Sequence, residues 1–225
     1  RFKKFFIKFS KVIFPIKEEM ERLRKGLEII SRVAPNVAVS VDTFRADVAS
    51  MCVEEYGVAM INDISGGELD KDMFRRVAKL HVPYILMHMK GTPRTMQDHP
   101  VYQDVVREVT DYLQRRIDYA KAQGLQDTQL LVDPGIGFGK TVEHNLTLMK
   151  RLRELTSFGL PVLLAASRKG TIGQVLGGLP PEERLEGTLA TTAQAVACGA
   201  QLVRVHDVKE HVRLVRMLEA IRQCP

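Results

Sequence analysis

The chain has 225 residues, of which 45% are apolar and 27% charged, a composition typical of a globular protein with a substantial core. It contains no stretch of about 18 consecutive apolar residues, so the sequence predicts no membrane-spanning helix. The three cysteines (Cys52, Cys198 and Cys224) are far apart, which argues against a disulfide framework and a zinc–cysteine site. A reducing compartment is therefore expected, and we take it to be the cytoplasm.

The positive charge is concentrated at the start of the chain. The net charge is +6, from 33 Lys and Arg against 27 Asp and Glu. Residues 1–17 hold six of the basic residues and no acidic one, so the remainder is balanced at 27 against 27. Because the basic pI does not describe the rest of the domain, nucleic acid is not expected as a partner.

Residues 1–14 differ in composition from the rest of the chain. They contain five of the nine phenylalanines and four lysines. A membrane-surface anchor, an organelle-targeting peptide, one or two short strands of the fold, or a segment foreign to the natural chain would each fit this composition. We therefore treat 1–14 as an atypical basic and aromatic segment and 15–225 as one domain.

From residue 17 onward, apolar residues at helical spacing alternate with short β-branched runs. Strands are predicted over 37–42, 58–64, 83–89, 129–134, 160–167 and 201–207. Helices are predicted over 17–33, 45–56, 70–80, 104–123, 143–156, 171–176, 182–198 and 208–222. This alternation predicts an α/β protein with a parallel sheet, either an open doubly wound sheet or a closed (β/α)8 barrel. Six strands are too few for the closed barrel, so residues 1–14 should supply a strand or another subunit should close the gap.

Polar side chains stand where the predicted strands end. They are Asp42, Asn62, His88, Asp133, Lys169, Arg204 and His206. Ligands bind at the carboxyl ends of the strands in both architectures, so we expect these side chains to converge. Carboxylates and an amide suit a guanidine-like edge, and a pair of cations suits phosphate. The pattern predicts a polar heterocycle that carries a phosphorylated arm, although a salt bridge to Asp207 or to a nearby acid is the structural alternative for Arg204 and His206.

The segment DPGIGFGKT (133–141) nearly matches a phosphate-binding P-loop, but Pro134 stands where that motif has glycine. A tight turn between strand and helix is the simpler interpretation, with Phe138 projecting from between two glycines. Met87 alternates with Met89 along one strand, so one of the two faces inward and can pack on a flat ring.

Seven segments in order resemble the dihydropteroate synthases of folate biosynthesis: SVDT (40–43), INDISGG (61–67), LMHMKGTPRTMQ (86–97), LLVDPGIGFGK (130–140), SRKGTIG (167–173), ERLEGTLA (183–190) and RVHDV (204–208). The resemblance implies a (β/α)8 TIM-type barrel, incomplete at its N-terminal strands. It also implies a transferase that joins p-aminobenzoate to 6-hydroxymethyl-7,8-dihydropterin pyrophosphate, uses Mg²⁺ and is inhibited by sulfonamides. A homodimer is compatible with it.

The resemblance assigns a role to each candidate site residue. Asp42, Asn62 and Asp133 would bind the edge of the pterin, and Met87 would lie beside it. Phe138 would flank the aminobenzoate. Lys169 would contact the pterin near the aminobenzoate, and Arg204 and His206 would bind the pyrophosphate; these three are the catalytic candidates.

The sequence also departs from the family. The N-V-T-P-D-S-F-S and G-E-S-T-R-P-G types of motif are missing, and with them the asparagine that binds the metal, so no metal ligand is assigned in this chain. Gly170 stands where the family commonly has Ser, and Ala165 where it commonly has Gly. Two alternatives therefore stay open: a truncated or loop-deleted chain that binds pterin with little activity, and a pterin-binding methyltransferase domain, against which SRK and RVHDV argue.

Overall fold

A computed structural model of the chain describes residues 4–7, 14–92, 96 and 99–224, with the side chains of 4–7 excepted. The chain divides into two compact units. Unit 1 comprises Arg1–Met87 and Leu113–Leu131, and unit 2 comprises His88–Tyr112 and Val132–Pro225.

Unit 1 is built on parallel strands. They are β1 (Lys4–Ile7), β2 (Ala38–Asp42), β3 (Met60–Asp63), β4 (Tyr84–Met87) and the start of β5 (Leu130–Asp133), in the spatial order β1-β2-β3-β4-β5. Phe6 pairs with Ser40 across β1 and β2, and Asp42 pairs with Asn62 across β2 and β3. The segment 1–14 thus supplies a strand, which confirms one of the two ways expected for extending the sheet.

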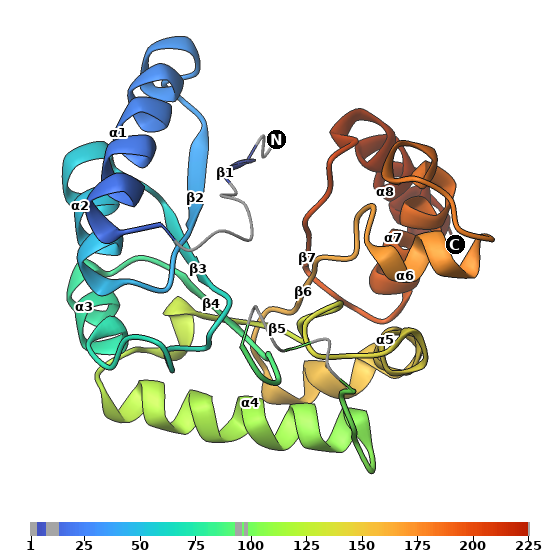
Figure 1. Ribbon diagram of the computed structural model, residues 1–225. Coiled ribbons are helices and arrows are strands. Elements are labelled where there is room, and N and C mark those ends of the chain that lie inside the picture. The colour runs from blue at the N-terminus through green and yellow to red at the C-terminus, as the bar shows by residue number, and fades with distance from the viewer. Residues whose placement is uncertain (1–3, 8–13, 93–95, 97–98, 225) are drawn as a thin grey trace. The chain divides into compact units, whose positions relative to one another are not determined.

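Three helices lie along one side of these strands, where Figure 1 shows them in a row: α1 (Ile16–Val33), α2 (Ala46–Tyr56) and α3 (Met73–Leu80). Leu23 and Leu27 are one turn apart on α1 and at most 2% exposed, as the helical spacing predicts. Helix α2 ends at Gly57, whose left-handed φ of 64° a glycine adopts without strain. The 3-10 turn Asp127–Gln129 precedes β5.

Unit 2 contains the end of β5 and two short parallel strands, β6 (Leu163–Leu164) and β7 (Leu202–Val203). Its helices are α5 (Val142–Lys150), α6 (Gly170–Val175), α7 (Leu185–Ala197) and α8 (Val208–Gln223), with 3-10 turns at Leu152–Phe158 and Pro181–Glu183. Helix α4 (Val105–Ala122) begins in unit 2 and continues into unit 1.

All six predicted strands are present, but they are shorter than predicted. Three helix boundaries were wrong, and the helix predicted over 70–80 begins at Met73. The helix predicted over 143–156 ends at Lys150 and gives way to a 3-10 segment. There the hydroxyls of Thr156 and Ser157 donate to the carbonyls three residues earlier, at 2.7 Å each, which competes with α-helical bonding. The helix predicted over 182–198 begins at Leu185, after a short turn started by proline.

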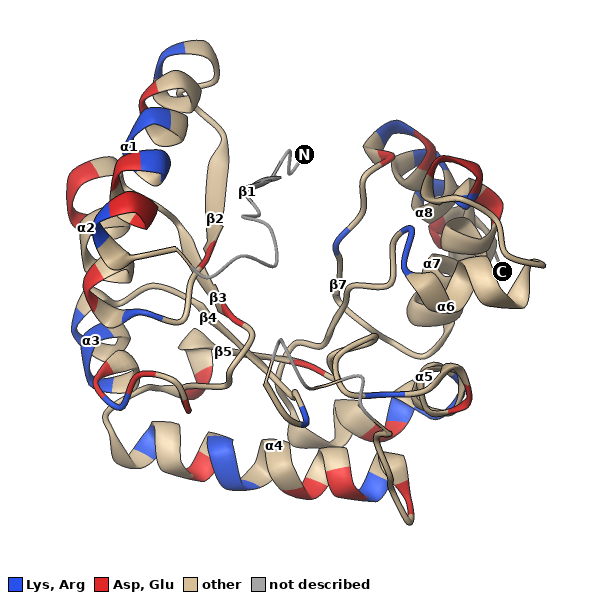
Figure 2. Ribbon diagram, viewed as in Figure 1, with Lys and Arg blue, Asp and Glu red and all other residues tan. Residues whose placement is uncertain are grey.

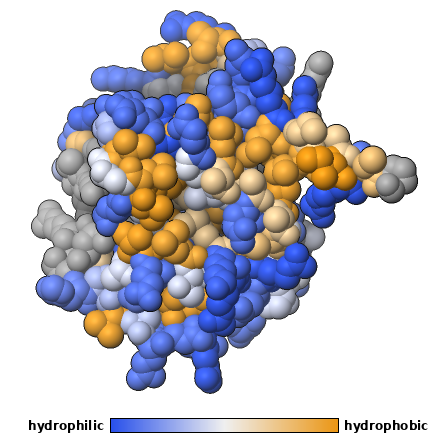
Figure 3. Space-filling view, turned by 90° about the vertical axis from the view of Figure 1, so that its right-hand side faces the viewer, coloured by the Kyte–Doolittle hydropathy of each residue, from blue (hydrophilic) through white to orange (hydrophobic). Residues whose placement is uncertain are grey.

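Charges of both signs are interspersed along the helices (Figure 2), as expected for a balanced domain. Within the described residues, no helix combines the length and apolarity needed to cross a bilayer. Helix α8 carries four exposed apolar side chains, Val208, Val212, Met217 and Ile221, which are 42–61% exposed. Met217 and Ile221 are one turn apart and form what we call the α8 apolar face. Figure 3, which looks toward the helices of unit 2, shows apolar side chains gathered among polar ones.

Candidate functional site

The ends of β2 and β3 place Asp42 beside Asn62. The amide Nδ2 of Asn62 donates to Asp42 Oδ1 at 2.7 Å, and this bond to a carboxylate identifies the other amide atom as the oxygen. Asn62 is only 3% exposed, and its Oδ1 has no hydrogen-bond partner among the described residues. A buried acceptor without a donor is costly, so this corner is suited to a ligand that brings an N–H group.

Backbone and side-chain bonds hold this corner in place. The Thr43 hydroxyl donates to Glu19 at 2.8 Å, and the Thr43 amide donates to the carbonyl of Asn62 at 3.0 Å. Arg45 forms a salt bridge with the same Glu19. The end of β2 is therefore tied to α1 as well as to β3, which restricts the movement of Asp42.

Asp63, the next residue on β3, has a structural role. Its carboxylate accepts from the Ser65 amide and hydroxyl (2.7 Å each), the Gly67 amide (2.9 Å) and the Tyr84 hydroxyl (2.6 Å). Complete burial raises the pKa of Asp63, and these donors oppose the rise. Met87 ends β4 and is 3% exposed, so it belongs to the buried part of unit 1.

In unit 2, Asp133 ends β5 and is 3% exposed. Its Oδ1 accepts from the Gly135 amide at 2.7 Å. Burial raises the pKa of the carboxyl, and the positive charges of Lys169 and Arg204 act in the opposite direction. These two predicted site residues therefore lie close enough to Asp133 to influence its charge.

The glycine loop after β5 is a tight turn, as the simpler interpretation predicted. Gly135, Gly137 and Gly139 adopt left-handed φ values of 69°, 79° and 63°. Phe138 is half-buried, and the Lys169 ammonium lies 4.8 Å from the centre of its ring. Lys169 also donates to the carbonyl of Ile136.

The P-loop interpretation of this segment conflicts with the position of its lysine. Lys140 is 3% exposed, and its ammonium donates to the carbonyls of Gly135 and Phe138 at 2.9 and 3.0 Å. A P-loop lysine instead reaches the phosphates of a nucleotide.

Ser167 positions His206 after β7. The Ser167 hydroxyl lies 2.9 Å from His206 Nδ1, and the His206 amide donates to it at 3.2 Å. When the hydroxyl donates to Nδ1, the ring proton is on Nε2, which can then donate to an anion. Asp207 pairs with Arg168 through two hydrogen bonds, and this pairing lowers the pKa of Asp207. The salt bridge to Asp207, one structural alternative for Arg204 and His206, is thus made by Arg168.

The predicted site residues fall into two groups. Unit 1 holds Asp42, Asn62 and Met87, and unit 2 holds Asp133, Phe138, Lys169, Arg204 and His206. The structure pairs Asp42 with Asn62 and Phe138 with Lys169. Sequence reasoning missed the supporting roles of Ser167 and Lys140. For Lys140 a signal was present, because a lysine directly after a buried glycine turn needs acceptors.

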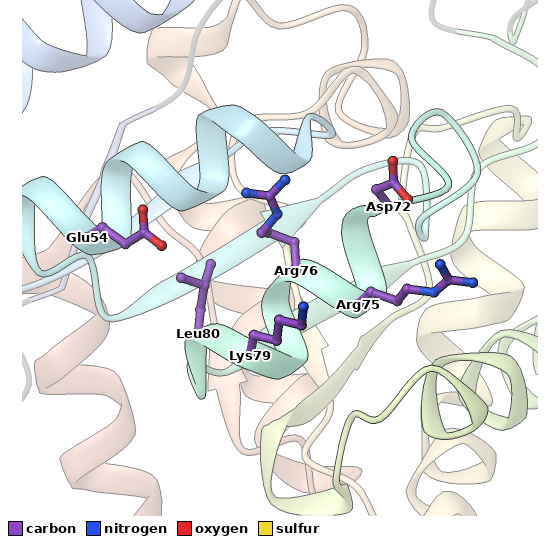
Figure 4. Close-up of a pocket in the computed structure, with 6 residues that line it drawn as sticks. All are labelled: Glu54, Asp72, Arg75, Arg76, Lys79 and Leu80. Atoms are coloured by element: carbon purple, nitrogen blue, oxygen red, sulfur yellow. The ribbon is translucent and has the colours of Figure 1, made fainter.

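A groove of about 600 Å³ lies between α2 and α3, and it includes none of the predicted site residues. Figure 4 shows its lining: Glu54, Asp72, Arg75, Arg76, Lys79 and Leu80. Arg76 already bonds to Asp47 and Ser50 of α2, and Arg75 bonds to Gln123. The arginines that line the groove are thus used in contacts between neighbouring helices.

Within the described residues, no three His, Cys, Asp or Glu side chains gather in a way that could hold a metal ion. The described residues therefore do not supply a set of protein ligands that could bind a metal ion by themselves.

The chain matches a known protein family and is similar in sequence to characterised proteins. The family model described as "Pterin binding enzyme" matches residues 10–206. The dihydropteroate synthase of Synechocystis sp. is 39% identical over 206 residues, which cover 92% of this chain and 71% of that protein.

Two solved structures are also similar. The Yersinia pestis dihydropteroate synthase in a sulfonamide drug complex is 37% identical, with a TM-score of 0.89 over 95% of this chain and 76% of that one. The Xanthomonas albilineans dihydropteroate synthase in complex with 7,8-dihydropteroate is 36% identical, with a TM-score of 0.88 over 99% and 82%. These similarities confirm the predicted fold class, an α/β protein of the (β/α)8 barrel type.

Proposed function

The chain belongs to the pterin-binding enzymes, and among them to the dihydropteroate synthases, and on this premise we propose that it joins p-aminobenzoate to 6-hydroxymethyl-7,8-dihydropterin pyrophosphate. The products are 7,8-dihydropteroate and pyrophosphate. The observation that carries the proposal is the unpartnered amide oxygen of Asn62, buried beside the Asp42 carboxylate.

The edge of a pterin carries an amino group and a ring N–H. Either group can donate a hydrogen bond to Asn62 Oδ1, which has no donor among the described residues. Asn62 Oδ1 accepts one N–H, and Asp42 supplies a carboxylate next to it. In unit 2, Asp133 is a further carboxylate, and one of its oxygens is already held by the Gly135 amide. Met87 offers a polarisable side chain to the flat ring.

Arg204 and His206 act on the leaving group. The C–O bond between the pterin methylene and the pyrophosphate breaks, and both electrons leave with the oxygen. The guanidinium of Arg204 and the imidazole of His206 stabilise the negative charge that builds on that oxygen. The aniline nitrogen of p-aminobenzoate then attacks the methylene cation and loses a proton, which completes the new C–N bond.

Phe138 and Lys169 form the subsite for p-aminobenzoate. The ring of Phe138 can flank the aromatic ring of the substrate, and the Lys169 ammonium already lies 4.8 Å from the centre of the Phe138 ring. Sulfonamides, which resemble aminobenzoate in shape, compete at this subsite. Mg²⁺ is expected from the family. Because the described residues do not form a cage for it, no step of the reaction is assigned to the metal.

The first experiment separates binding from turnover. Titration calorimetry with the pterin pyrophosphate should show binding by the wild-type chain, and a radiolabelled aminobenzoate assay should show dihydropteroate. Asn62→Leu should weaken binding by about tenfold to a hundredfold, because an amide with buried hydrogen bonds is lost. Asn36→Leu, a change of the same type at an exposed position, is the control and should bind as the wild type does. Pterin binding without product would replace the proposal with a binding chain that lacks turnover.

The second experiment tests whether Arg204 serves the pyrophosphate. Arg204→Met should weaken binding of the pterin pyrophosphate and leave binding of 6-hydroxymethylpterin, which has no phosphate, unchanged. Equal losses for the two ligands would contradict the assignment.

The proposed enzyme is a cytoplasmic homodimer. The compartment is supported by three free cysteines, of which Cys52 and Cys198 are buried. A second copy of the chain would cover the α8 apolar face. Sedimentation velocity should give a dimer, and Met217→Glu combined with Ile221→Glu should give a monomer. A monomeric wild-type chain at micromolar concentration would overturn this part of the proposal.

A further inference from the structure

Lys140 is a buried charged residue that the proposed reaction does not use. It ends the glycine loop and is only 3% exposed. Burying an ammonium is costly unless its hydrogens are all bonded, so a lysine kept at such a position needs a compensating interaction.

The Lys140 ammonium has an acceptor for each of its three hydrogens. Nζ lies 2.8 Å from His88 Nδ1, 2.9 Å from the Gly135 carbonyl and 3.0 Å from the Phe138 carbonyl. When Lys140 is protonated its ammonium only donates, so Nδ1 is then the acceptor of the His88 ring and the ring proton is on Nε2. His88 is itself fixed, since its amide donates to the Asp133 carbonyl at 3.1 Å.

The two carbonyls belong to opposite parts of the loop, so the ammonium joins them across it. Between them lie Ile136, whose carbonyl accepts from Lys169, and Gly137, whose amide donates to Asn145 at 2.8 Å. Left-handed glycines have little intrinsic preference for one conformation. The position of Phe138 therefore depends on bonds made to the loop from outside it.

We propose that Lys140, with His88 as its acceptor, is a positioning residue that braces the glycine loop and so holds Phe138 and Lys169 in place for p-aminobenzoate. This inference rests on the proposed function, and it adds which residues shape the aminobenzoate subsite. In this role Lys140 acts through the backbone of residues 135–138, to which its ammonium is bonded at Gly135 and Phe138.

The test combines a structural measurement with kinetics on the full-length chain. Lys140→Met keeps the length of the side chain and removes the donors. Lys150→Met, an exposed lysine on α5, is the matched control. Hydrogen exchange of the peptide covering 133–141 should accelerate about tenfold or more in Lys140→Met and stay unchanged in the control.

The kinetic arm asks which constant changes. Lys140→Met should raise the KM for p-aminobenzoate by about tenfold, while kcat and the Kd for the pterin pyrophosphate change less than about threefold. A purely structural role would lower the fraction of active enzyme and would therefore reduce kcat without a selective change in this KM.

Two substitutions of His88 keep the inference testable if Lys140→Met does not fold. His88→Asn keeps an acceptor near the position of Nδ1 and should retain most of the affinity for aminobenzoate. His88→Leu removes the acceptor and should reproduce the KM increase. The proposal that Lys140 braces the loop would be overturned by equal kinetics for the two His88 variants. Unchanged hydrogen exchange of residues 133–141 in an active Lys140→Met variant would also overturn it. A wild-type chain that forms no product would instead overturn the proposed function.

Discussion

The burial of Lys140 makes a prediction about stability as a function of pH. Burial lowers the pKa of Lys140 from 10.5 to about 7, while the charge of Asp133 opposes the fall. Burial also holds the pKa of His88 at about 2, so the imidazole is neutral at every pH at which Lys140 titrates. Between pH 7 and 10.5 the unfolded chain carries a proton on this lysine that the folded chain has released.

The sign follows from the difference in bound protons. Because the unfolded state binds more protons in this window, the free energy of unfolding increases as the pH rises from about 7 toward 10.5. Each pH unit contributes about 1.4 kcal/mol, so the whole window corresponds to about 5 kcal/mol, and the accessible part between about pH 7 and 9 to about 2.5 kcal/mol.

The assay is urea denaturation of the wild type and Lys140→Met at half-unit steps from about pH 6 to 9.5. The difference between their free energies of unfolding should be flat below about pH 7 and should then shift in favour of the wild type. The same comparison with Lys150→Met should give no such slope, because Lys150 is exposed. A difference that stays flat, or shifts against the wild type, would refute the reasoning. It would mean that the three acceptors, at about 1.5–3 kcal/mol each for a charged donor, outweigh the cost of burial.

Three further substitutions probe the framework of the site through the free energy of unfolding. Gly139→Ala should destabilise the chain by about 2–4 kcal/mol in urea denaturation, because φ is 63° and the new Cβ would overlap the Lys90 carbonyl and lie 2.9 Å from Lys90 Cβ. Gly170→Ser should stabilise it by about 0.5 kcal/mol, measured as a higher Tm, since the added Cβ meets nothing within 4 Å at the start of α6. Tyr84→Phe should cost about 2 kcal/mol in the same denaturation assay, because it removes a 2.6 Å hydrogen bond to the buried carboxylate of Asp63.

Each of these substitutions has a defined contrary result. Gly177→Ala is the control for backbone strain alone, because φ is 80° there and no atom lies within 4 Å of the added Cβ. If Gly139→Ala lowers the free energy of unfolding by no more than Gly177→Ala does, the expected clash with Lys90 does not occur. A lower Tm for Gly170→Ser would mean that the hydroxyl disturbs the turn before α6. If Tyr84→Phe leaves the free energy of unfolding unchanged, the other hydrogen-bond donors to Asp63 are sufficient.

The sequence by itself determined the order of the elements and the residues at the strand ends. Apolar runs of β-branched residues between two helices favour buried strands, and the residue that follows each run must leave the sheet at the same edge. The pattern of residues was therefore enough to place Asp42, Asn62 and Asp133 at the ends of strands, and to predict the tight turn at Gly135–Gly139.

Tertiary structure decided which partner each of these side chains has. Lys140 and His88 are 52 residues apart, and Ser167 and His206 are 39 apart, so no local periodicity connects them. The alternation of strands and helices fixes which residues face an edge of the sheet, but the pairing of one polar side chain with another depends on distances of a few tenths of an ångström. Those distances are set by packing of the whole core, because a buried polar group is stable only where a partner of the right geometry has been brought to it.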